Sequence, residues 1–335
     1  MEKLYFNVIN LFYKPYQPTI FKLYQKLRSF QKLYETLNID KKIDIEKEYE
    51  KVEKLGIKIL TIDDKGYPEM LRNIDEPPLG IYLLGNLDLS FPIAIVGTRK
   101  AGSYGKRVAR KFSEELSKLG ITIISGLAFG IDEEAHKGSL EFGKTIAVLG
   151  EGIDLALNSP KKTLIDKILE KGGGIISEFS LGTPGLKQHF PLRNRIIAGV
   201  SNGVVIVEAP INSGALITAN YGLKYGKEIF VVPGEITNKN FEGSHNLIKQ
   251  GAKLVTSIED ILSEFDFDLK KKEKAIKLNL SPKEEIIYEI LKTEPLTLEE
   301  IMIKTKMNVQ DLLTILTHME VRGIIKNVGG KFYLE

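Results

Sequence analysis

The pattern of apolar and polar positions divides the chain into three parts. In the longest part, from about Ile59 to Phe265, short and nearly continuous apolar runs alternate with amphipathic segments. These runs are IAIVG at 93–97, ITIIS at 121–125, TIAVL at 145–149, GIISE at 174–178, VVIVE at 204–208 and IFVVP at 229–233. Parallel strands that are covered by helices on both faces have this composition. The pattern predicts an α/β fold with an extended Rossmann-like, doubly wound sheet over residues 59–265.

The segments between the apolar runs have helical spacing. After Ser103, the apolar side chains of Val108, Phe112 and Leu116 recur on one stripe, and Gly120 follows where a left-handed residue can end a helix. Strands that alternate with such helices form a parallel sheet.

The first part, residues 1–58, is rich in Lys, Leu, Tyr and Phe. Leu23, Leu27, Phe30 and Leu33 recur at helical spacing, which predicts a helical N-terminal domain. Its tyrosines are candidates for base stacking, but aromatic residues at helical spacing more often pack in a core, and we adopt that interpretation.

The last part begins with a charged stretch, residues 266–280, whose weak periodicity predicts a linker. Residues 281–335 then contain helix candidates followed by two short strand candidates around Gly329-Gly330. The helix candidates are Lys283–Leu291, Thr297–Lys304 and Asn308–Arg322. This order predicts a winged-helix domain, a fold that binds duplex DNA or other proteins.

Composition limits the chemistry of the protein. The 335 residues carry a net charge of +3 and no cysteine, which excludes disulfides, thiolate metal sites and cysteine nucleophiles. The four histidines are scattered and none is paired at ligand spacing, so we expect neither a metal nor a cofactor. The N-terminus lacks a signal-peptide layout, and no apolar run reaches about 18 residues. We therefore expect a cytoplasmic protein without a membrane segment.

The loop after the first predicted strand, Gly97–Gly105, is a candidate phosphate site. Glycines such as Gly97 let the backbone approach an anion, the next helix starts with free amides, and Arg99 adds a forked charge. The loop is not a Walker A motif, and it departs from G-x-G-x-x-G because Arg99 occupies the second glycine position. The alternative is that these glycines only form a tight turn.

Two further strand ends have small residues before a helix. Ser125-Gly126 follows the second predicted strand, and the Ser125 hydroxyl could bond a phosphate or a ribose oxygen. Ser213-Gly214 follows the fifth predicted strand and opens a helix whose amides would face the same crevice. Ligands of open α/β sheets bind at these carboxyl ends.

The segment after the fourth predicted strand concentrates cations and rings. It contains Lys187, His189, Phe190, Arg193, Asn194 and Arg195. Phosphate contacts from the cations, with a base stacked on Phe190 or His189, would match the way single strands are bound. The alternative is that the two arginines form salt bridges with Glu178 and Glu208, which end neighbouring strands.

In these segments the chain resembles the DprA/Smf family, the DNA-processing proteins of natural transformation. The resemblance extends from about Tyr67 to Leu262 and rests on IAIVGTRKAGSYG, SGLAFGIDEEAH, HFPLRNRIIAGVS, VVIVEAPINSGALITA and VVPG, in that order. It implies a Rossmann-like core that forms a homodimer, binds and protects incoming single-stranded DNA, and loads the RecA recombinase onto it. Single-strand-binding protein is a further implied partner.

Carried over by motif, the DNA-binding positions are Arg99 with its glycines, Ser125-Gly126, Lys187 and the block from His189 to Arg195. The sequence departs from the family pattern before His189, where the usual prolines and arginine are replaced by Pro184-Gly185-Leu186-Lys187-Gln188. This departure leaves open whether Lys187 supplies the missing charge.

Two other functions compete with a non-catalytic DNA binder. One is a nucleotide-processing enzyme that hydrolyses a glycosidic bond with Glu208 as its acid, base or nucleophile. Such hydrolases carry a Pro-Gly-Gly-x-Gly-Thr-x-x-Glu run, whereas Pro233-Gly234 continues here as Glu235-Ile236-Thr237, so we expect no enzyme. The other is a winged-helix regulator that senses a ligand with its core and binds specific duplex sequences.

Overall fold

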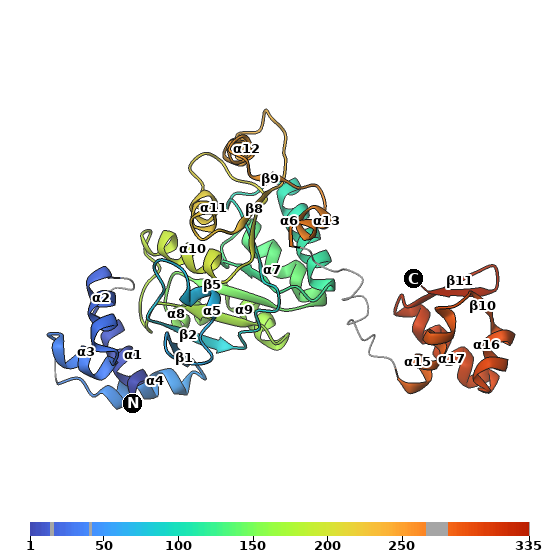
Figure 1. The fold of residues 1–335 in the computed structure, drawn as a ribbon, viewed down its shortest axis with the longest axis horizontal. Coiled ribbons are helices and arrows are strands. Elements are labelled where there is room, and N and C mark those ends of the chain that lie inside the picture. The colour runs from blue at the N-terminus through green and yellow to red at the C-terminus, as the bar shows by residue number, and fades with distance from the viewer. Residues whose placement is uncertain (14–16, 40–41, 266–280, 335) are drawn as a thin grey trace. The chain divides into compact units, whose positions relative to one another are not determined.

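The computed structural model describes residues 1–13, 17–39, 42–265 and 281–334 (Figure 1). The chain forms two compact units, Met1–Asp268 and Leu269–Glu335. The predicted linker, residues 266–280, lies outside the described residues. The predicted domain boundary between residues 58 and 59 stays a prediction.

The first unit is built on a nine-stranded sheet in the order β1-β2-β6-β5-β4-β3-β7-β8-β9. The strands are β1 Lys58–Thr61, β2 Gly80–Gly85, β3 Ile93–Val96, β4 Ile123–Ser125, β5 Thr145–Leu149, β6 Gly174–Ser177, β7 Gly203–Ile206, β8 Glu228–Val231 and β9 Lys253–Leu254. The strands β3 to β9 pair in parallel with one another in the sheet. The strands β1 and β2 extend the sheet beyond β6 with antiparallel pairs. The predicted doubly wound α/β sheet is confirmed, and β3 to β8 are the six apolar runs.

Helices cover the sheet between successive strands. They are α5 Glu69–Arg72, α6 Ser103–Lys118, α7 Ile131–Phe142, α8 Ile153–Leu157, α9 Lys162–Glu170, α10 His189–Gly199, α11 Gly214–Lys224, η1 Lys239–Phe241, α12 Glu242–Lys249, α13 Ile258–Leu262 and η2 Ser263–Phe265. Helix α6 packs against α7, and α10 packs against α11. As the apolar stripe predicts, α6 buries Phe112 and Leu116, and Gly120 behind it has a φ of 71°.

The N-terminal helices are α1 Glu2–Phe12, α2 Pro18–Leu27, α3 Phe30–Thr36 and α4 Ile45–Lys54. The predicted stripe is divided between two helices, because α2 ends at Leu27 and its C-cap, Arg28, has a left-handed φ of 51°. The tyrosine interpretation is supported: Tyr24 is 3% exposed, and its ring stacks on Phe30 with a centroid distance of 4.2 Å. The Phe6 ring lies 6.0 Å from that of Tyr82 in β2, so these helices share a core with the sheet.

The second unit contains α15 Pro282–Leu291, β10 Leu296–Thr297, α16 Leu298–Thr305, α17 Val309–Val321, β11 Ile325–Val328 and β12 Lys331–Leu334. Gly329 and Gly330 have φ values of 61° and 81°, which suit the tight turn between β11 and β12. The predicted winged-helix fold is confirmed. In the described ranges of both units, no helix combines the length and apolarity that crossing a bilayer requires.

Candidate nucleic-acid interface

The largest change of direction in the sheet creates a cleft. The chain passes from β3 outward through β4, β5 and β6, and then returns to the other side of β3 to form β7. The helices on either side diverge at this switch point, where open α/β sheets bind their ligands. A cleft of about 500 Å³ opens there, at the carboxyl ends of β3 and β7.

The structure brings most of the predicted site residues to this cleft. Those that line it are Gly97, Arg99, Lys187, Phe190, Arg193, Asn194, Ser213 and Gly214. Ser125, Gly126, His189 and Arg195 do not line it. Sequence reasoning missed Thr98, Lys100, Asp132, Asn212 and Thr218, which do. Lys100 had a visible signal, since it directly follows Arg99 in the glycine loop.

The division follows from the helical geometry of α10. Its residues Phe190, Arg193, Asn194 and Ile197 recur at intervals of three or four and face the cleft. His189 is only 4% exposed, and its ring stacks on Phe179 at a centroid distance of 4.4 Å. The prediction that a base stacks on His189 is therefore wrong for this conformation.

Arg195 is a structural residue. Its side chain is completely buried, and Nη2 donates to both carboxylate oxygens of Glu178, at 2.5 and 2.6 Å. Burial raises the pKa of Glu178, and the guanidinium opposes that rise. We therefore remove Arg195 from the predicted DNA contacts. The alternative salt bridge to Glu178 is correct, whereas the one to Glu208 does not form, because Glu208 accepts from Gly102 and Asn240.

Ser125 and Gly126 support the cleft from behind instead of binding a ligand. The buried Ser125 hydroxyl donates to the Ile95 carbonyl at 2.7 Å, which corrects its predicted role. The Gly126 amide donates to the Asp132 carboxylate at 3.1 Å, and a Cβ on Gly126 would come within 2.6 Å of Arg193 Nη2. Only glycine leaves room for the Arg193 guanidinium.

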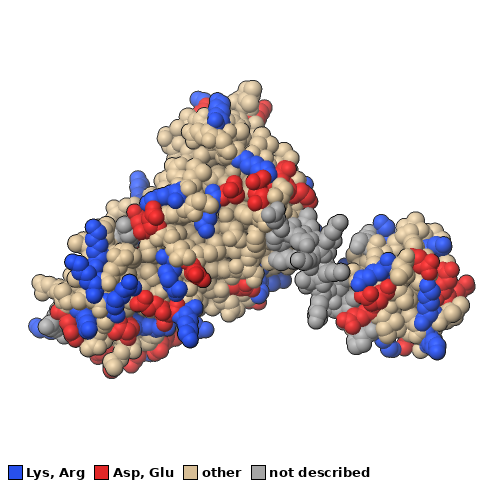
Figure 2. Space-filling model, viewed as in Figure 1, with Lys and Arg blue, Asp and Glu red and all other residues tan. Residues whose placement is uncertain are grey.

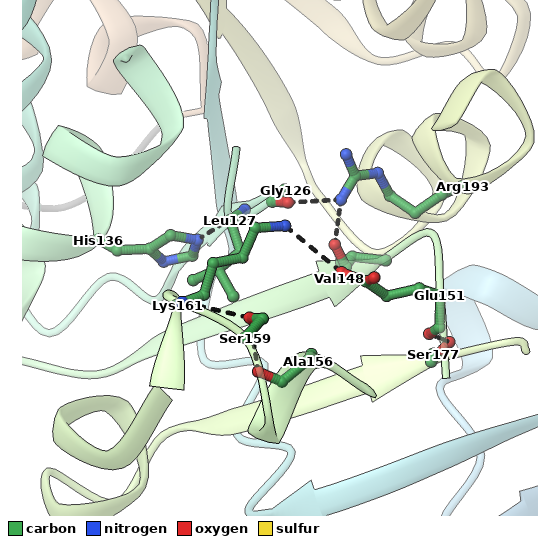
Figure 3. A network of polar contacts seen from close by, with 10 residues as sticks. All are labelled: Gly126, Leu127, His136, Val148, Glu151, Ala156, Ser159, Lys161, Ser177 and Arg193. Atoms are coloured by element: carbon green, nitrogen blue, oxygen red, sulfur yellow. Dashed lines mark hydrogen bonds and ion pairs between the residues drawn. The ribbon is translucent and has the colours of Figure 1, made fainter. Parts of the chain in front are cut away.

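Arg193 joins two strand ends below the cleft (Figure 3). Its Nη1 donates to the carbonyl of Gly126, which directly follows β4, and to that of Val148, which lies in β5. Its Nε donates to the Asn194 side chain at 3.1 Å. Burial lowers the pKa of Arg193 to about 10, and Asp132 opposes that change. Arg193 thus stays charged at neutral pH and adds a fixed positive field to the cleft.

Three exposed cations line the cleft together with Phe190: Arg99, Lys100 and Lys187. The Arg99 guanidinium lies over the ring, 4.7 Å from its centroid, and that of Arg193 lies 6.0 Å away. None of the three exposed cations forms an ion pair with a carboxylate of the described residues. Their charges are available to a phosphate.

The glycine loop differs from the predicted phosphate cradle in one respect. The N-terminus of α6 already holds an anion of the protein itself, because the Gly102 amide donates to both oxygens of Glu208 at 3.1 Å. The helix start that lines the cleft belongs to α11, where Ser213 is the N-cap, Gly214 is the first helical residue and the Ser213 hydroxyl accepts from the Ala215 amide at 3.2 Å. An anion would therefore meet the Gly214 amide and the Arg99 side chain, not the α6 amides.

The carboxylates near the cleft are engaged within the protein. Glu208 is 1% exposed and accepts from Asn240 Nδ2 at 2.6 Å, in addition to Gly102. Burial raises the pKa of Asp132, against the charge of Arg193. The described residues contain no cluster of metal-ligating side chains. The arrangement as a whole offers cations, helix amides and an aromatic ring, the groups that bind a phosphate backbone and a base.

Two family models match the chain. The model described as DNA recombination-mediator protein A matches residues 58–266, more than half of the chain, and the DprA winged helix domain matches residues 271–331. The chain belongs to the DprA/Smf family. Protein Smf of Escherichia coli (strain K12) is 45% identical over 214 residues, which are 63% of this chain and 57% of that DprA/Smf protein. The chain thus spans little more than half of the length of this relative.

Solved DprA structures share the fold. The X-ray structure of DprA from Streptococcus pneumoniae superposes with a TM-score of 0.64 and 35% identity, covering 73% of this chain and 91% of that one. A Helicobacter pylori DprA structure, described by its single-stranded DNA binding mode, superposes with a TM-score of 0.57 and 27% identity, covering 63% and 96%.

Proposed function

We propose that this DprA/Smf protein binds single-stranded DNA in the cleft between β3 and β7. The observation that carries the proposal is that three exposed, unpaired cations, Arg99, Lys100 and Lys187, line the same cleft as the Phe190 ring. Single strands are held by cations that follow the backbone and by aromatic rings that stack with bases, with little preference for sequence. The single-stranded DNA binding named for the Helicobacter pylori relative supports the same substrate class.

The finer part of the proposal concerns the role of this binding. We infer that the protein is a non-catalytic mediator that protects incoming DNA during natural transformation and loads the RecA recombinase onto it. Single-strand-binding protein is a second protein partner, and the chain acts in the cytoplasm as a homodimer. The family description, a recombination mediator, supports this role.

A competition assay tests the substrate class. Full-length protein bound to a labelled single strand is challenged with unlabelled single strands of different sequence and with duplex. We expect every single strand to compete and duplex to compete poorly, with a slope of log affinity against log salt near −2, about −0.7 for each of three exposed cations. Equal competition by duplex would contradict the proposal and favour a winged-helix regulator.

A second assay addresses the glycosidase alternative. The same preparation is incubated with nucleoside monophosphates, and free base is measured by chromatography. We expect no release, because the carboxylate of Glu208 is buried and occupied by Gly102 and Asn240. Release of base with turnover would replace the binding function by the enzymatic one.

A further inference from the structure

A second hollow lies on the other side of the Gly97–Gly105 loop from the cleft. It has a volume of about 450 Å³ and is lined by Tyr104, Pro233, Gly234, Glu235, Asn238 and Phe241. Its walls come from the start of α6 and from the loop after β8, which reaches the same carboxyl edge of the sheet as the loop after β3. We propose that this hollow binds a second base of the same DNA strand, an inference that rests on the proposed function.

The aromatic wall of the hollow is exposed and held in place. Tyr104 is 43% exposed, and its hydroxyl donates to the Pro233 carbonyl at 3.0 Å. Behind it the buried Phe241 ring lies at 5.9 Å and packs so closely on Gly234 that a Cβ there would be 2.2 Å from the ring. Because the Tyr104 ring is fixed at both ends, a base can stack on it without ordering a mobile side chain.

The glycine loop and η1 meet between the cleft and the hollow, and we call this contact the ridge. It carries two cations, Lys100 and Lys239. Asn240 Nδ2 donates to the Lys100 carbonyl at 3.3 Å, so η1 lies directly against the glycine loop. Lys100 and Lys239 are both exposed, and neither forms an ion pair within the described residues. Phosphates between the two bases would meet these lysines as the strand crosses the ridge.

The rim of the hollow determines which bases it accepts. Glu235 is exposed and Asn238 is half-buried at this rim. The Glu235 carboxylate repels phosphate but accepts hydrogen bonds from amino groups, which cytosine, adenine and guanine have and thymine lacks. The hollow should therefore favour bases that carry an amino group.

Strand length separates the hollow from the cleft experimentally. We expect a strand of about three nucleotides to occupy only the cleft, whereas one of about twelve crosses the ridge into the hollow. In full-length protein, Tyr104→Ala should weaken binding of the long strand about tenfold and leave the short one unchanged. Tyr104→Phe should retain binding, because the ring remains.

The matched control is Phe142→Ala, which removes a ring that is 55% exposed at the far end of α7 and should affect neither strand. Equal weakening of both strands by Tyr104→Ala would mean that Tyr104 only holds the loop of Arg99, and would overturn the second base site, as would no effect on either. If the wild-type protein binds neither strand, the proposed function itself fails.

Base preference provides the second readout. With long strands, the wild-type protein should bind oligo-dC about tenfold more tightly than oligo-dT, which is the size of one hydrogen bond to a charged group. Glu235→Gln should reduce this preference, since the amide accepts more weakly than the carboxylate. Equal binding of the two strands by the wild-type protein would contradict the role of Glu235 and the base selectivity of the hollow.

Discussion

The cleft and the winged-helix unit use their cations in opposite ways. Around the cleft, the exposed Arg99, Lys100 and Lys187 have no carboxylate partner among the described residues. In the winged-helix unit, by contrast, four of the seven described lysines and arginines form ion pairs, as in Lys283–Asp311 at 2.9 Å and Lys304–Glu294 at 2.8 Å. Figure 2 shows the result on one face of this unit, where blue and red side chains lie beside one another. Unpaired charges retain their full attraction for phosphate, whereas paired charges have largely lost it.

The contrast extends to the helix that would read a duplex. The exposed positions of α17 include Val309, Gln310, Leu313 and Thr314, and its first turn carries Asp311. Recognition helices that enter the major groove present arginine, lysine, asparagine or glutamine to base edges and cations to phosphates. The exposed face of α17 has one such residue, Gln310, beside apolar ones. This favours the core, not the winged-helix unit, as the main DNA site.

The largest expected effect comes from removing the unpaired cations. The triple variant Arg99→Ala, Lys100→Ala, Lys187→Ala should weaken single-strand binding about a thousandfold, since each charge-assisted contact contributes about 1.5 kcal/mol. The slope of log affinity against log salt should move from near −2 toward zero. The matched control, Lys283→Ala, Lys292→Ala, Lys304→Ala, changes three paired lysines of the other unit. Fluorescence anisotropy at several salt concentrations measures the affinity and the salt slope of both triple variants. Equal losses of affinity in the two variants would show that the two regions do not differ in DNA binding.

The paired charges should instead control stability. Burial raises the pKa of Glu284, but hydrogen bonds from Ser281 and His318 and the charge of Arg322 outweigh it and lower the pKa to about 2. Because this pKa is lower in the folded than in the unfolded state, the carboxylate stabilises the unit above about pH 4.5. That contribution, about 3 kcal/mol, is lost as the pH falls toward about 2.

Calorimetric unfolding of the full chain between about pH 2 and about pH 6 measures this loss. Glu284→Gln should lower the unfolding temperature of the winged-helix transition near neutral pH and flatten its dependence on pH. The transition of the sheet unit should be unchanged by the substitution and is the internal control. A winged-helix transition with the same pH dependence in both proteins would show that the Glu284 pairs contribute no stability.

Much of the sheet could be predicted because burial on both faces leaves a direct record in the sequence. The runs that became β3 to β8 are apolar at nearly every position, and the glycines of the wing turn have positive φ. The strands β1 and β2 were missed, since KILT and GIYLLG are short and only the four-residue helix α5 lies between them. Their antiparallel pairing depends on contacts of β1 with β2 and of β2 with β6, which no local pattern records.

The position of the site at the strand ends was predicted more accurately than the individual residues that line it. The block from His189 to Arg195 was treated as one basic cluster, yet as a helix it turns Arg193 toward the cleft and Arg195 toward Glu178. Applying the period of 3.6 residues from Phe190 would have separated them. The capture of the α6 amides by Glu208 could not be foreseen, because these residues are over a hundred positions apart and only the fold brings them together.

The smallest expected effect concerns the Phe190 ring. Phe190→Ala should cost about 1–3 kcal/mol in single-strand affinity if a base stacks there. Because Arg99 lies over one face of the ring, a base must use the other face or displace the guanidinium, so part of the stacking energy is offset. Leu313→Ala, an exposed apolar change on α17, is the control and should leave affinity unchanged. If Phe190→Ala lowers the unfolding temperature but not the affinity, the ring supports the helix α10 and the cations alone hold the strand.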